Sequence, residues 1–223
     1  PSIKEQEKIG DFFKNLDNLI ELHQRELELT KDLKKSMLQK MFPKKGETTP
    51  EIRFDGFTDD WRRRKLGEVV NVCSGRDYKH LSEGDIPVYG TGGYMLSVDN
   101  ALSFEDDAIG IGRKGTIDKP YILKAPFWTV DTLFYTIPKK DNMLEFVYNI
   151  FQNITWKKKD ESTGVPSLSK RTINNVNVLI PSIKEQEKIG DFFKNLDNII
   201  ELHGRELDTL KQAKKSLLQH MFI

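Results

Sequence analysis

Hydrophobic residues recur every three or four positions along both ends of the chain. The steps alternate between four and three in residues 1–42, and the same series returns in residues 181–223. The positions are Ile9, Phe13, Leu16, Ile20, His23, Leu27, Thr30, Lys34, Met37 and Met41 in the first segment, and Ile189, Phe193, Leu196, Ile200, His203, Leu207, Leu210, Lys214, Leu217 and Met221 in the second. This spacing is typical of a coiled-coil seam, so each segment is predicted to form one long helix.

The two end segments are copies of one sequence. Residues 1–42 and 181–222 are identical at 33 of 42 positions, and the run PSIKEQEKIGDFFKNLDN is repeated without change. A helix of about 40 residues is roughly 60 Å long at about 1.5 Å per residue, so it needs a partner along its length. The nearest partner is the other copy. The sequence therefore predicts that the two helices pair as an antiparallel coiled coil, as two chain ends that leave one domain side by side would do.

Each copy begins with a helix-start signature and contains one glycine. Ser2 and Ser182 each precede a glutamate by three positions, which is the spacing of the reciprocal capping box. Gly10 and Gly190 lie inside the predicted helices, where glycine costs roughly 1 kcal/mol relative to alanine. Close helix contact at both glycines is expected to offset that cost.

Polar residues interrupt the predicted seam at matching places in the two copies. His23 corresponds to His203, and Lys34 corresponds to Lys214. Two interpretations remain open. These side chains set the register, because a polar group on the seam disfavours slipped pairings, or they lie half exposed, with each lysine extending its ammonium group into water.

The middle of the chain has a different texture. After a linker-like run, PKKGETTPEIRF at residues 43–54, short β-rich runs alternate with Gly, Asp and Asn turns, and they are followed by a helix over 143–156, a short helix over 167–175 and a strand over 176–180. The β-rich runs are EVVNVC, DIPVYG, AIGIG, TIDKPYIL and FWTVDTLFYTI. The expected fold is α+β, with a mixed α/β domain flanked by two long paired helices. The predicted segments are 1–42, 43–180 and 181–223.

Composition narrows the function classes without choosing among them. With 37% hydrophobic and 31% charged residues and no long apolar run, the chain is expected to be cytoplasmic and to have no membrane contact. Cys73 is the only cysteine, which excludes an internal disulfide and a cysteine-based zinc cluster. The net charge of +1 means that a nucleic-acid site must come from local clustering of Lys and Arg. Because the chain opens with Pro1 and enters a repeat directly, we expect a segment of a longer protein.

Motifs for catalysis and cofactors are weak. The run GIGRKG at residues 110–115 fits the dinucleotide fingerprint, but the following residues look like a strand, so a hairpin that presents Arg113 and Lys114 is favoured. No phosphate-binding G-x-x-x-x-G-K-[ST] loop and no H-E-x-x-H or other paired-histidine spacing occurs, so no cofactor and no metal site is predicted. Asp106 and Asp107 are interpreted as a turn rather than as magnesium ligands. No catalytic residue is assigned.

Basic, hydroxyl and aromatic residues in the loops of the middle segment are the remaining candidates. Phosphates require cationic, hydroxyl or amide donors, and base edges require planar forks such as arginine together with small polar groups. The DNA-binding candidates are Arg76, Tyr78, Lys79, Thr91, Tyr94, Arg113, Lys114, Lys119, Lys157, Lys158, Lys159, Thr163 and Lys170. Each of them could also be an ordinary solvated side chain. A cluster from several loops on one face would favour binding.

Three runs in the sequence resemble the DNA specificity subunit of type I restriction-modification enzymes. They are GVPSLSKRTINNVNVLIPSIKEQEKIGDFFKNLDNIIE at residues 164–201, PEIRFDGFTDDWRRRKLGEV at residues 50–69, and AIGIGRKGTI at residues 108–117. The arrangement of helical region, recognition domain and helical region is similar too. The resemblance covers essentially the whole chain, and it departs from the family in containing one recognition domain rather than two.

The resemblance implies a function without catalysis. In this family each recognition domain reads one half of a bipartite target in double-stranded DNA, and paired helices act as a ruler that seats the methyltransferase subunits. Restriction subunits join the assembly to cut DNA, and S-adenosylmethionine and ATP belong to those partners. Lys157, Lys158, Lys159 and Lys170 are then expected to hold phosphates, while Arg76, Thr91, Tyr94 and Arg113 are candidates for base contact. A homodimer would restore two recognition domains.

Two other function classes are weighed against this one. A coiled-coil scaffold or adaptor that does not bind DNA would have the same helices. A stand-alone methyltransferase is disfavoured, because neither a catalytic N-P-P-[FY] loop nor a glycine-rich cofactor site is present. Binding to random duplex DNA separates the specificity subunit from the scaffold.

Overall fold

The structure is a computed structural model that describes residues 1–221. It divides into two compact units, which are considered separately. Residues 1–38 together with residues from 192 onward form one unit, called here the helical pair, and residues 39–191 form the other, called the head. Within residues 1–221 no helix is both long enough and apolar enough to cross a membrane.

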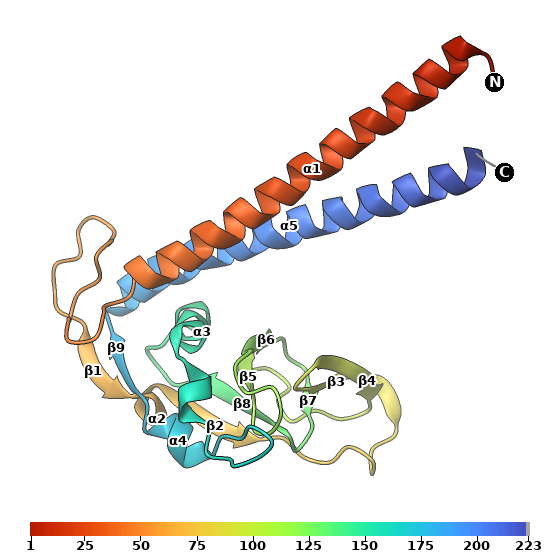
Figure 1. Cartoon of the computed structure of the whole chain (residues 1–223). Coiled ribbons are helices and arrows are strands. Elements are labelled where there is room, and N and C mark those ends of the chain that lie inside the picture. Colours follow the sequence, from red (N-terminus) through yellow and green to blue (C-terminus); the bar gives the residue numbers. More distant parts are fainter. Residues whose placement is uncertain (222–223) are drawn as a thin grey trace. The chain divides into compact units, whose positions relative to one another are not determined.

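The helical pair consists of two long antiparallel helices. α1 (Ile3–Lys40) has 38 residues and α5 (Ile183–Met221) has 39, and the two run side by side in opposite directions (Figure 1). Every predicted seam position in residues 9–37 of α1 and 193–217 of α5 is buried or half buried. The predicted long helices and their antiparallel pairing are therefore confirmed.

Lysines on the seam form ion pairs across it. Lys34 Nζ lies 2.5 Å from Asp197 Oδ1, and Lys214 pairs with Asp17. Asp197 and Lys214 occupy, in the second copy, the positions of Asp17 and Lys34 in the first. The same contact is thus made twice, and the helical pair has local twofold symmetry. Because these lysines find partners on the opposite helix, the geometry favours their interpretation as register-setting residues.

The head contains three small sheets and three short α-helices. The sheets are β1 (Arg62–Lys65) with β9 (Asn177–Ile180); β2 (Val70–Ser74), β8 (Leu133–Pro138), β5 (Ala108–Gly112) and β6 (Tyr121–Leu123) in that order; and β4 (Gly93–Val98), β3 (Glu83–Gly90) and β7 (Trp128–Thr129) in that order. The helices are α2 (Leu66–Val69), α3 (Leu144–Asn153) and α4 (Lys170–Asn174), with a 3-10 turn, η1 (Trp156–Lys159). All strand pairs are antiparallel except β3 with β7. The expected α+β class is confirmed.

The core of the head lies around β5 and α3. All five residues of β5 are buried, as expected for a strand covered on both faces, and α3 packs against β5 and β8 (Figure 1). Phe42, Trp61 and Phe146 form an aromatic cluster with ring centroids 5.6–5.8 Å apart. Since Phe42 and Trp61 flank the run at residues 43–54, this linker-like run is anchored to the head at both ends.

The predicted hairpin at residues 110–115 is confirmed, with a longer connection than expected. β5 pairs antiparallel with β6, so a strand follows the glycine run and the dinucleotide fingerprint lacks its helix. β6 covers only three residues of the predicted run TIDKPYIL. Asp107 accepts hydrogen bonds from Lys124 Nζ at 2.6 Å and from the amide of Ala125 at 2.9 Å. Its carboxylate therefore ties the residue before β5 to the residues after β6, rather than closing the local turn that the sequence predicted.

The capping box predicted for the second copy is wrong in its side-chain part. The carboxylate of Glu185 binds Arg53 through both oxygens, at 2.7 and 2.8 Å, and Oε1 also accepts a hydrogen bond from Trp61 Nε1 at 3.2 Å. Glu185 is only 1% exposed. The backbone carbonyl of Ser182 still accepts the amides at the helix start. Glu185 therefore joins α5 to the chain that precedes β1 rather than closing its own helix.

The glycines of the two copies differ in their surroundings. A Cβ added at Gly190 would lie 3.1 Å from Glu145 Cβ and 3.2 Å from Phe146 N, whereas one added at Gly10 meets nothing within 4 Å. The predicted close contact is thus confirmed at Gly190 and wrong at Gly10. The first turns of α3 pack onto α5 at Gly190, and this close packing is possible because glycine has no side chain.

Candidate nucleic-acid interface

One edge of the head collects the ends of several strands. β2 and β5 both run antiparallel to β8, which lies between them, so their last residues and the first residue of β8 share an edge. β3 and β7 also end here, because the amide of Val130 donates to Tyr89 O at 3.0 Å and the amide of Arg76 donates to Thr129 O at 2.8 Å. Loops from distant parts of the sequence therefore meet at this edge.

The loop after β5 places two cations on this edge. The amides of Arg113 and Lys114 donate to the carbonyl of Thr132 at 2.8 and 3.2 Å. Gly112 is required before them, because a Cβ there would lie 2.0 Å from Thr116 O. The side chains of Arg113 and Lys114 are exposed, as the hairpin prediction expected.

Arg113 is positioned by contacts that leave its charge accessible. Its guanidinium carbon lies 5.8 Å from the centroid of the Phe134 ring, within cation–π range, and Nη1 lies 3.4 Å from Asp131 O. Phe134 is itself buried at the start of β8. A planar group held by a ring and a carbonyl has less freedom to lose on binding, which suits an arginine that recognises a base.

The segment at residues 160–169 lies beside this loop and is held to it by backbone hydrogen bonds. The amide of Leu168 donates to Arg113 O at 2.9 Å, and the amide of Gly115 donates to Pro166 O at 2.8 Å. Ser167 pairs with Lys114 as an isolated β-bridge. The segment that contains Thr163 and precedes Lys170 is thereby fixed against the Arg113 loop.

Two carboxylates give this segment its shape. Asp160 accepts the amides of Ser167 and Ser162 at 2.9 and 3.0 Å, and these hydrogen bonds lower the pKa of Asp160. Glu161 accepts hydrogen bonds from the hydroxyl of Thr172 at 2.5 Å and from the amide of Ser169 at 2.7 Å, and both bonds lower the pKa of Glu161. Both acids are therefore ionised at neutral pH and are occupied in organising the loop.

A groove of about 800 Å³ lies between these loops. Its lining residues are Arg113, Lys114, Phe134, Glu161, Ser162, Thr163, Gly164, Val165, Ser167, Leu168, Ser169 and Lys170. Cations, hydroxyls and one aromatic ring predominate, with Glu161 as the only acid. These are the donor types that phosphates and base edges require.

Arg76 and Thr91 reach the same edge from two other loops. Gly75, which precedes Arg76, lies so close to the loop before β8 that a Cβ would come within 2.0 Å of Val130 O. A Cβ added at Gly115 would lie 3.9 Å from Thr91 Oγ1, so the β3–β4 turn adjoins the Arg113 loop. The name cationic edge is used below for Arg76, Thr91, Arg113, Lys114, Thr163 and Lys170.

Of the other candidate residues, the two tyrosines contact residues next to this edge: Tyr94 contacts the ring of Tyr89, and Tyr78 packs on the cluster that contains Val130. Tyr78 packs against the core cluster that contains Val88 and Trp128, so its ring is structural in large part. Tyr94 is 62% exposed, and its hydroxyl lies 3.2 Å from Ser97 Oγ. Lys79 is exposed on the loop before β3.

The lysines around the 3-10 turn η1 form a separate group. Lys157 Nζ lies 2.9 Å from Asp118 Oδ2, and this pairing lowers the pKa of Asp118. Lys119 and Lys158 are exposed, whereas Lys159 is half buried. Part of the positive charge expected to face phosphates is thus already balanced by an acid in the head.

Sequence reasoning passed over one cationic run in the head. β1 has the sequence RRRK, and all four of its residues are exposed. Arg62 and Arg64 also line a cavity of about 660 Å³, where the basic side chains of Arg53, Arg62, Arg64 and Lys140 are matched by the acids Asp59, Asp60, Asp141 and Glu185. Four consecutive basic residues are a readable signal for a nucleic-acid or acidic partner. Phe134, the ring under Arg113, had no readable signal, because it looks like any strand residue.

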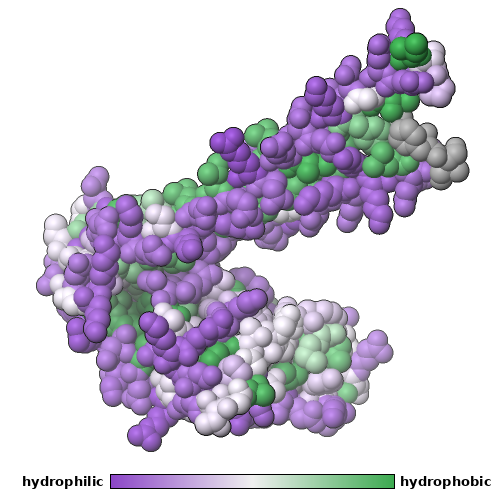
Figure 2. Space-filling view, viewed as in Figure 1, coloured by the Kyte–Doolittle hydropathy of each residue, from purple (hydrophilic) through white to green (hydrophobic). Residues whose placement is uncertain are grey.

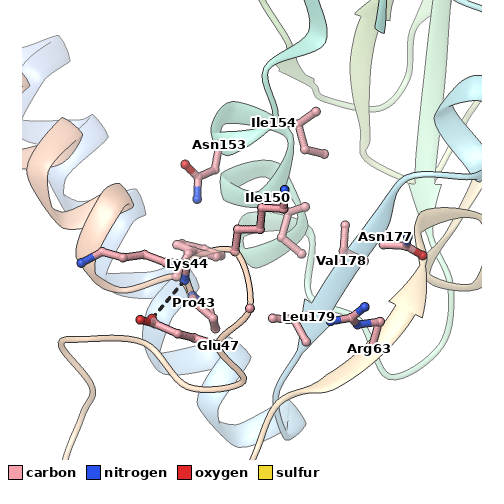
Figure 3. A pocket seen from close by; sticks show the side chains of 13 residues that line it. Pro43, Lys44, Glu47, Arg63, Ile150, Asn153, Ile154, Asn177, Val178 and Leu179 are labelled. Atoms are coloured by element: carbon pink, nitrogen blue, oxygen red, sulfur yellow. Dashed lines mark hydrogen bonds between the residues drawn. The ribbon is translucent and has the colours of Figure 1, made fainter. Parts of the chain in front are cut away.

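A further pocket of about 320 Å³ lies between the linker-like run, α3 and β9 (Figure 3). Its side chains include Ile150, Ile154 and Val178, and the amide of Lys44 donates to Glu47 at 3.4 Å. Lys44 Nζ is also paired with Glu51 at 2.8 Å. The charges of Lys44 and Glu47 are thus used within the linker, so this side of the pocket is better explained by packing than by ligand binding.

Comparisons with known proteins agree with one another. A family model described as the type I restriction modification DNA specificity domain matches residues 58–212. The type I restriction enzyme MjaVIII specificity subunit of Methanocaldococcus jannaschii is 22% identical over 98% of the chain and 59% of its own length.

Solved structures share the fold. The type I restriction-modification S subunit from M. genitalium superposes with a TM-score of 0.74 at 21% identity, over 100% of the chain and 62% of that structure. A structure from work on complex assembly and conformational transition of the type I R-M system gives a TM-score of 0.64 at 15% identity, over 98% and 59%. The chain spans about three fifths of the length of these relatives.

Proposed function

The chain belongs to the type I restriction-modification DNA specificity family, and on this premise we propose that it is a DNA-recognition subunit without catalysis of its own. Its head binds double-stranded DNA sequence-specifically and reads one half of a bipartite target, while partner subunits supply methylation and cleavage. A cytoplasmic location is part of this proposal. The observation that carries it is the cationic edge, where four loops bring cations and hydroxyls together and two of these loops line one groove.

Within the cationic edge, the residues differ in what they offer to DNA. Arg113 is a planar fork held over the Phe134 ring, so it is assigned to a base edge in the major groove, where arginine pairs with guanine O6 and N7. Arg76 and Thr91 are assigned to neighbouring bases. Lys114 and Lys170 are flexible point charges, which suit phosphates.

Arg113 provides the sharpest test of base recognition. Protein is mixed with a randomised duplex library, and the bound fraction is sequenced. Arg113→Ala should lose discrimination worth about 1–3 kcal/mol at one or two base pairs and leave the other positions unchanged. Arg113→Lys should behave similarly, because it retains the charge and loses the fork. If the wild-type protein enriches no sequence at all, the proposal fails.

Lys170 tests the phosphate assignment in the same assay. Lys170→Ala should weaken binding to all duplexes alike and lower the slope of log affinity against log salt by about one unit. Lys124→Ala is the matched control, since Lys124 is exposed but paired with Asp107 at 2.6 Å. An equal loss in the Lys124 and Lys170 variants would show that only bulk charge matters.

The methyltransferase partners are assigned to a second apolar stripe on the helical pair. Exposed hydrophobic side chains form a row along α1, next to the seam but distinct from it. They are spaced at steps of seven, three, seven and four residues, and each is 40–58% exposed: Phe12, Leu19, Leu22, Leu29 and Leu33. Ile199 and Leu202 repeat the positions of Leu19 and Leu22 in α5. Hydrophobic surface along α1 is visible in Figure 2. Such a heptad stripe suits helix-in-groove recognition.

Leu22→Glu tests this assignment by co-purification with a cognate methyltransferase subunit. The variant should lose the partner while retaining its helicity, because Leu22 is 51% exposed. Lys35→Glu introduces the same side chain at an exposed position about 140° around α1 from Leu22, and it should keep the partner. Restriction subunits are expected to join only through the assembled complex.

A second copy of this chain is the other partner that could bind this stripe, and the result would be a homodimer. Two copies would provide two heads and would require a palindromic site, because an isologous dimer repeats one reading head. Light scattering at micromolar concentration, with and without DNA, distinguishes the two states. A monomer under both conditions removes the dimer and leaves the methyltransferase assignment intact.

A further inference from the structure

Two histidines and two glutamates meet at the middle of the helical pair. α1 carries His23 and Glu26 and α5 carries His203 and Glu206, so both helices present the motif H-x-x-E. Residues three apart lie on one face of a helix, and the antiparallel pairing turns the two faces toward each other. The four side chains therefore surround the local twofold axis, flanked by the ion pairs Lys34–Asp197 and Asp17–Lys214.

The distances among these groups are longer than those of charge-assisted hydrogen bonds. His23 Nδ1 lies 3.4 Å from Glu206 Oε2 and 3.7 Å from Glu26 Oε2, and His203 Nδ1 lies 3.7 Å from Glu206 Oε2 and 3.8 Å from Glu26 Oε2. A charged nitrogen–oxygen hydrogen bond is normally about 2.7–2.9 Å. Both Nδ1 atoms are buried and have no hydrogen-bond partner in the described part of the chain.

The same distances fit a tetrahedral metal ion. Zinc binds histidine nitrogen and carboxylate oxygen at about 2.0–2.2 Å, which places neighbouring ligand atoms of a tetrahedron about 3.3–3.6 Å apart. The ligand atoms of His23, His203 and Glu206 all lie within 4.8 Å of one another. Two imidazoles and two carboxylates also balance the charge of a divalent cation.

We propose that His23, His203, Glu206 and Glu26 bind one zinc-class divalent metal ion that staples α1 to α5. His23, His203 and Glu206 provide three ligands from their present positions. Glu26 provides the fourth after a side-chain rotation, which is open to it because it is 43% exposed. Nitrogen and oxygen donors in a tetrahedral arrangement suit Zn²⁺ rather than Mg²⁺ or Ca²⁺, which prefer six or more oxygens.

The sequence predicted no metal site, and that prediction considered only ligands that are close together in one segment. The proposed site differs from it. Two of its ligands come from each copy of the repeat, so the sequence contains no motif of closely spaced histidines that would indicate the site. The ion would hold the register of the helical pair at its centre. Sliding one helix by a turn would separate His23 from His203, so the metal resists a change in the spacing that the helices set.

The test is a calorimetric titration. The full chain is first treated with a chelator to remove bound metal, and zinc is then added while the heat of binding is measured. We expect one Zn²⁺ per chain, and a loss of affinity of at least about 100-fold in His203→Ala, because a ligand should matter at least as much as an outer-shell partner. Zinc should also raise the melting temperature of the wild type and leave that of the variant unchanged. His220→Ala is the control, since His220 is exposed on the same helix and its Nδ1 lies 2.7 Å from Ser216 O.

A second variant guards against a folding artefact. Glu206→Gln preserves the size of the side chain and removes the anionic ligand, and circular dichroism checks that its helix content is unchanged. Cobalt bound to the wild type should give the visible absorption of a tetrahedral site, and the Glu206→Gln protein should not. No stoichiometric uptake by the wild type, or equal affinity in wild type and His203→Ala, overturns the proposal.

Discussion

Identical residues at the starts of α1 and α5 lie in opposite surroundings. Residues 1–10 and 181–190 have the same sequence, yet Glu5 and Gln6 are exposed while the equivalent Glu185 and Gln186 are each 1% exposed. β9 runs directly into α5, so the first turns of α5 are held within the head. The comparison teaches that a repeated sequence fixes the helix and its seam, whereas the neighbouring chain decides what its polar residues do.

The buried start of α5 is polar, and its polar groups are satisfied by the head. Gln186 donates from Nε2 to the carbonyls of Pro181 and Asp141 at 3.2 and 3.3 Å, and its Oε1 accepts the amide of Met143 at 3.1 Å. Asp141 has a positive φ of 66°, an uncommon conformation that these bonds help to hold. The equivalent Gln6 donates only to Pro1 O, at 3.1 Å, on the surface.

The largest difference in the free energy of unfolding is expected between the variants Glu185→Gln and Glu5→Gln. The first substitution leaves the guanidinium of Arg53, 14% exposed, without its charged partner, and breaking a buried ion pair on one side costs about 3 kcal/mol or more. The second should change the free energy of unfolding by less than about 0.5 kcal/mol, as is usual at exposed sites. Urea unfolding followed by tryptophan fluorescence measures both, since Trp61 donates to Glu185.

Equal effects of the two substitutions would mean that the contact of Glu185 with Arg53 contributes nothing to stability. Arg53→Met with Glu185→Leu offers a further check. Replacing both charges by apolar groups should cost less than Glu185→Gln alone, because no unpaired charge is left behind.

Gln186→Ala against Gln6→Ala should give the next largest difference. Gln186→Ala removes the partner of the part-buried amide of Met143 and of the carbonyls of Pro181 and Asp141, with an expected cost of about 2 kcal/mol. Gln6→Ala should be close to neutral. Hydrogen exchange gives a local readout, because the amide of Met143 should lose protection in the first variant alone. Retained protection there contradicts the assigned bond.

Asp197→Asn against Asp17→Asn examines the two symmetric ion pairs. Lys34 is 11% exposed in its side chain and Lys214 is 30% exposed, so removing Asp197 takes a charged partner from the more buried ammonium. We expect a cost of about 1.5 kcal/mol for Asp197→Asn and about 0.5 kcal/mol for Asp17→Asn, where water screens the charge. Unfolding followed by far-ultraviolet circular dichroism reports on the helices. The reverse order would show that exposure does not decide the value of these pairs.

The parts of the fold that sequence predicted depend on local pattern. The seam could be predicted because each step of three or four residues is visible in the chain, and the hairpin after Gly110 because β-branched residues follow the glycines. The capping box misled, because Arg53 competes for Glu185 from 132 residues away. β1 could not be assigned, since all its residues are exposed and show no alternation.

The candidate site was predictable to a similar degree. The turn at Arg113 follows from glycine chemistry, and its exposure is observed. The partial packing of Tyr78 against the Val88 cluster could not be predicted, because an aromatic residue in a loop looks the same whether it packs or binds. The partner of Lys157, Asp118, is remote in sequence, and so are His23 and His203, whose meeting depends on the pairing of two distant helices.

Gly190→Ala against Gly10→Ala should produce the smallest contrast, and one of opposite sign. At Gly10 a methyl group meets open space, so alanine should stabilise α1 by about 0.5–1 kcal/mol through backbone entropy alone. At Gly190 the same gain is opposed by contacts of 3.1 and 3.2 Å with Glu145 and Phe146, tighter than a Cβ normally makes. The first turn of α3 must shift to admit the methyl group, and we expect no gain or a net loss. Thermal melting of the two single variants measures the difference, and equal stabilisation by both would mean that α3 yields freely and that the glycine at 190 is not needed for packing.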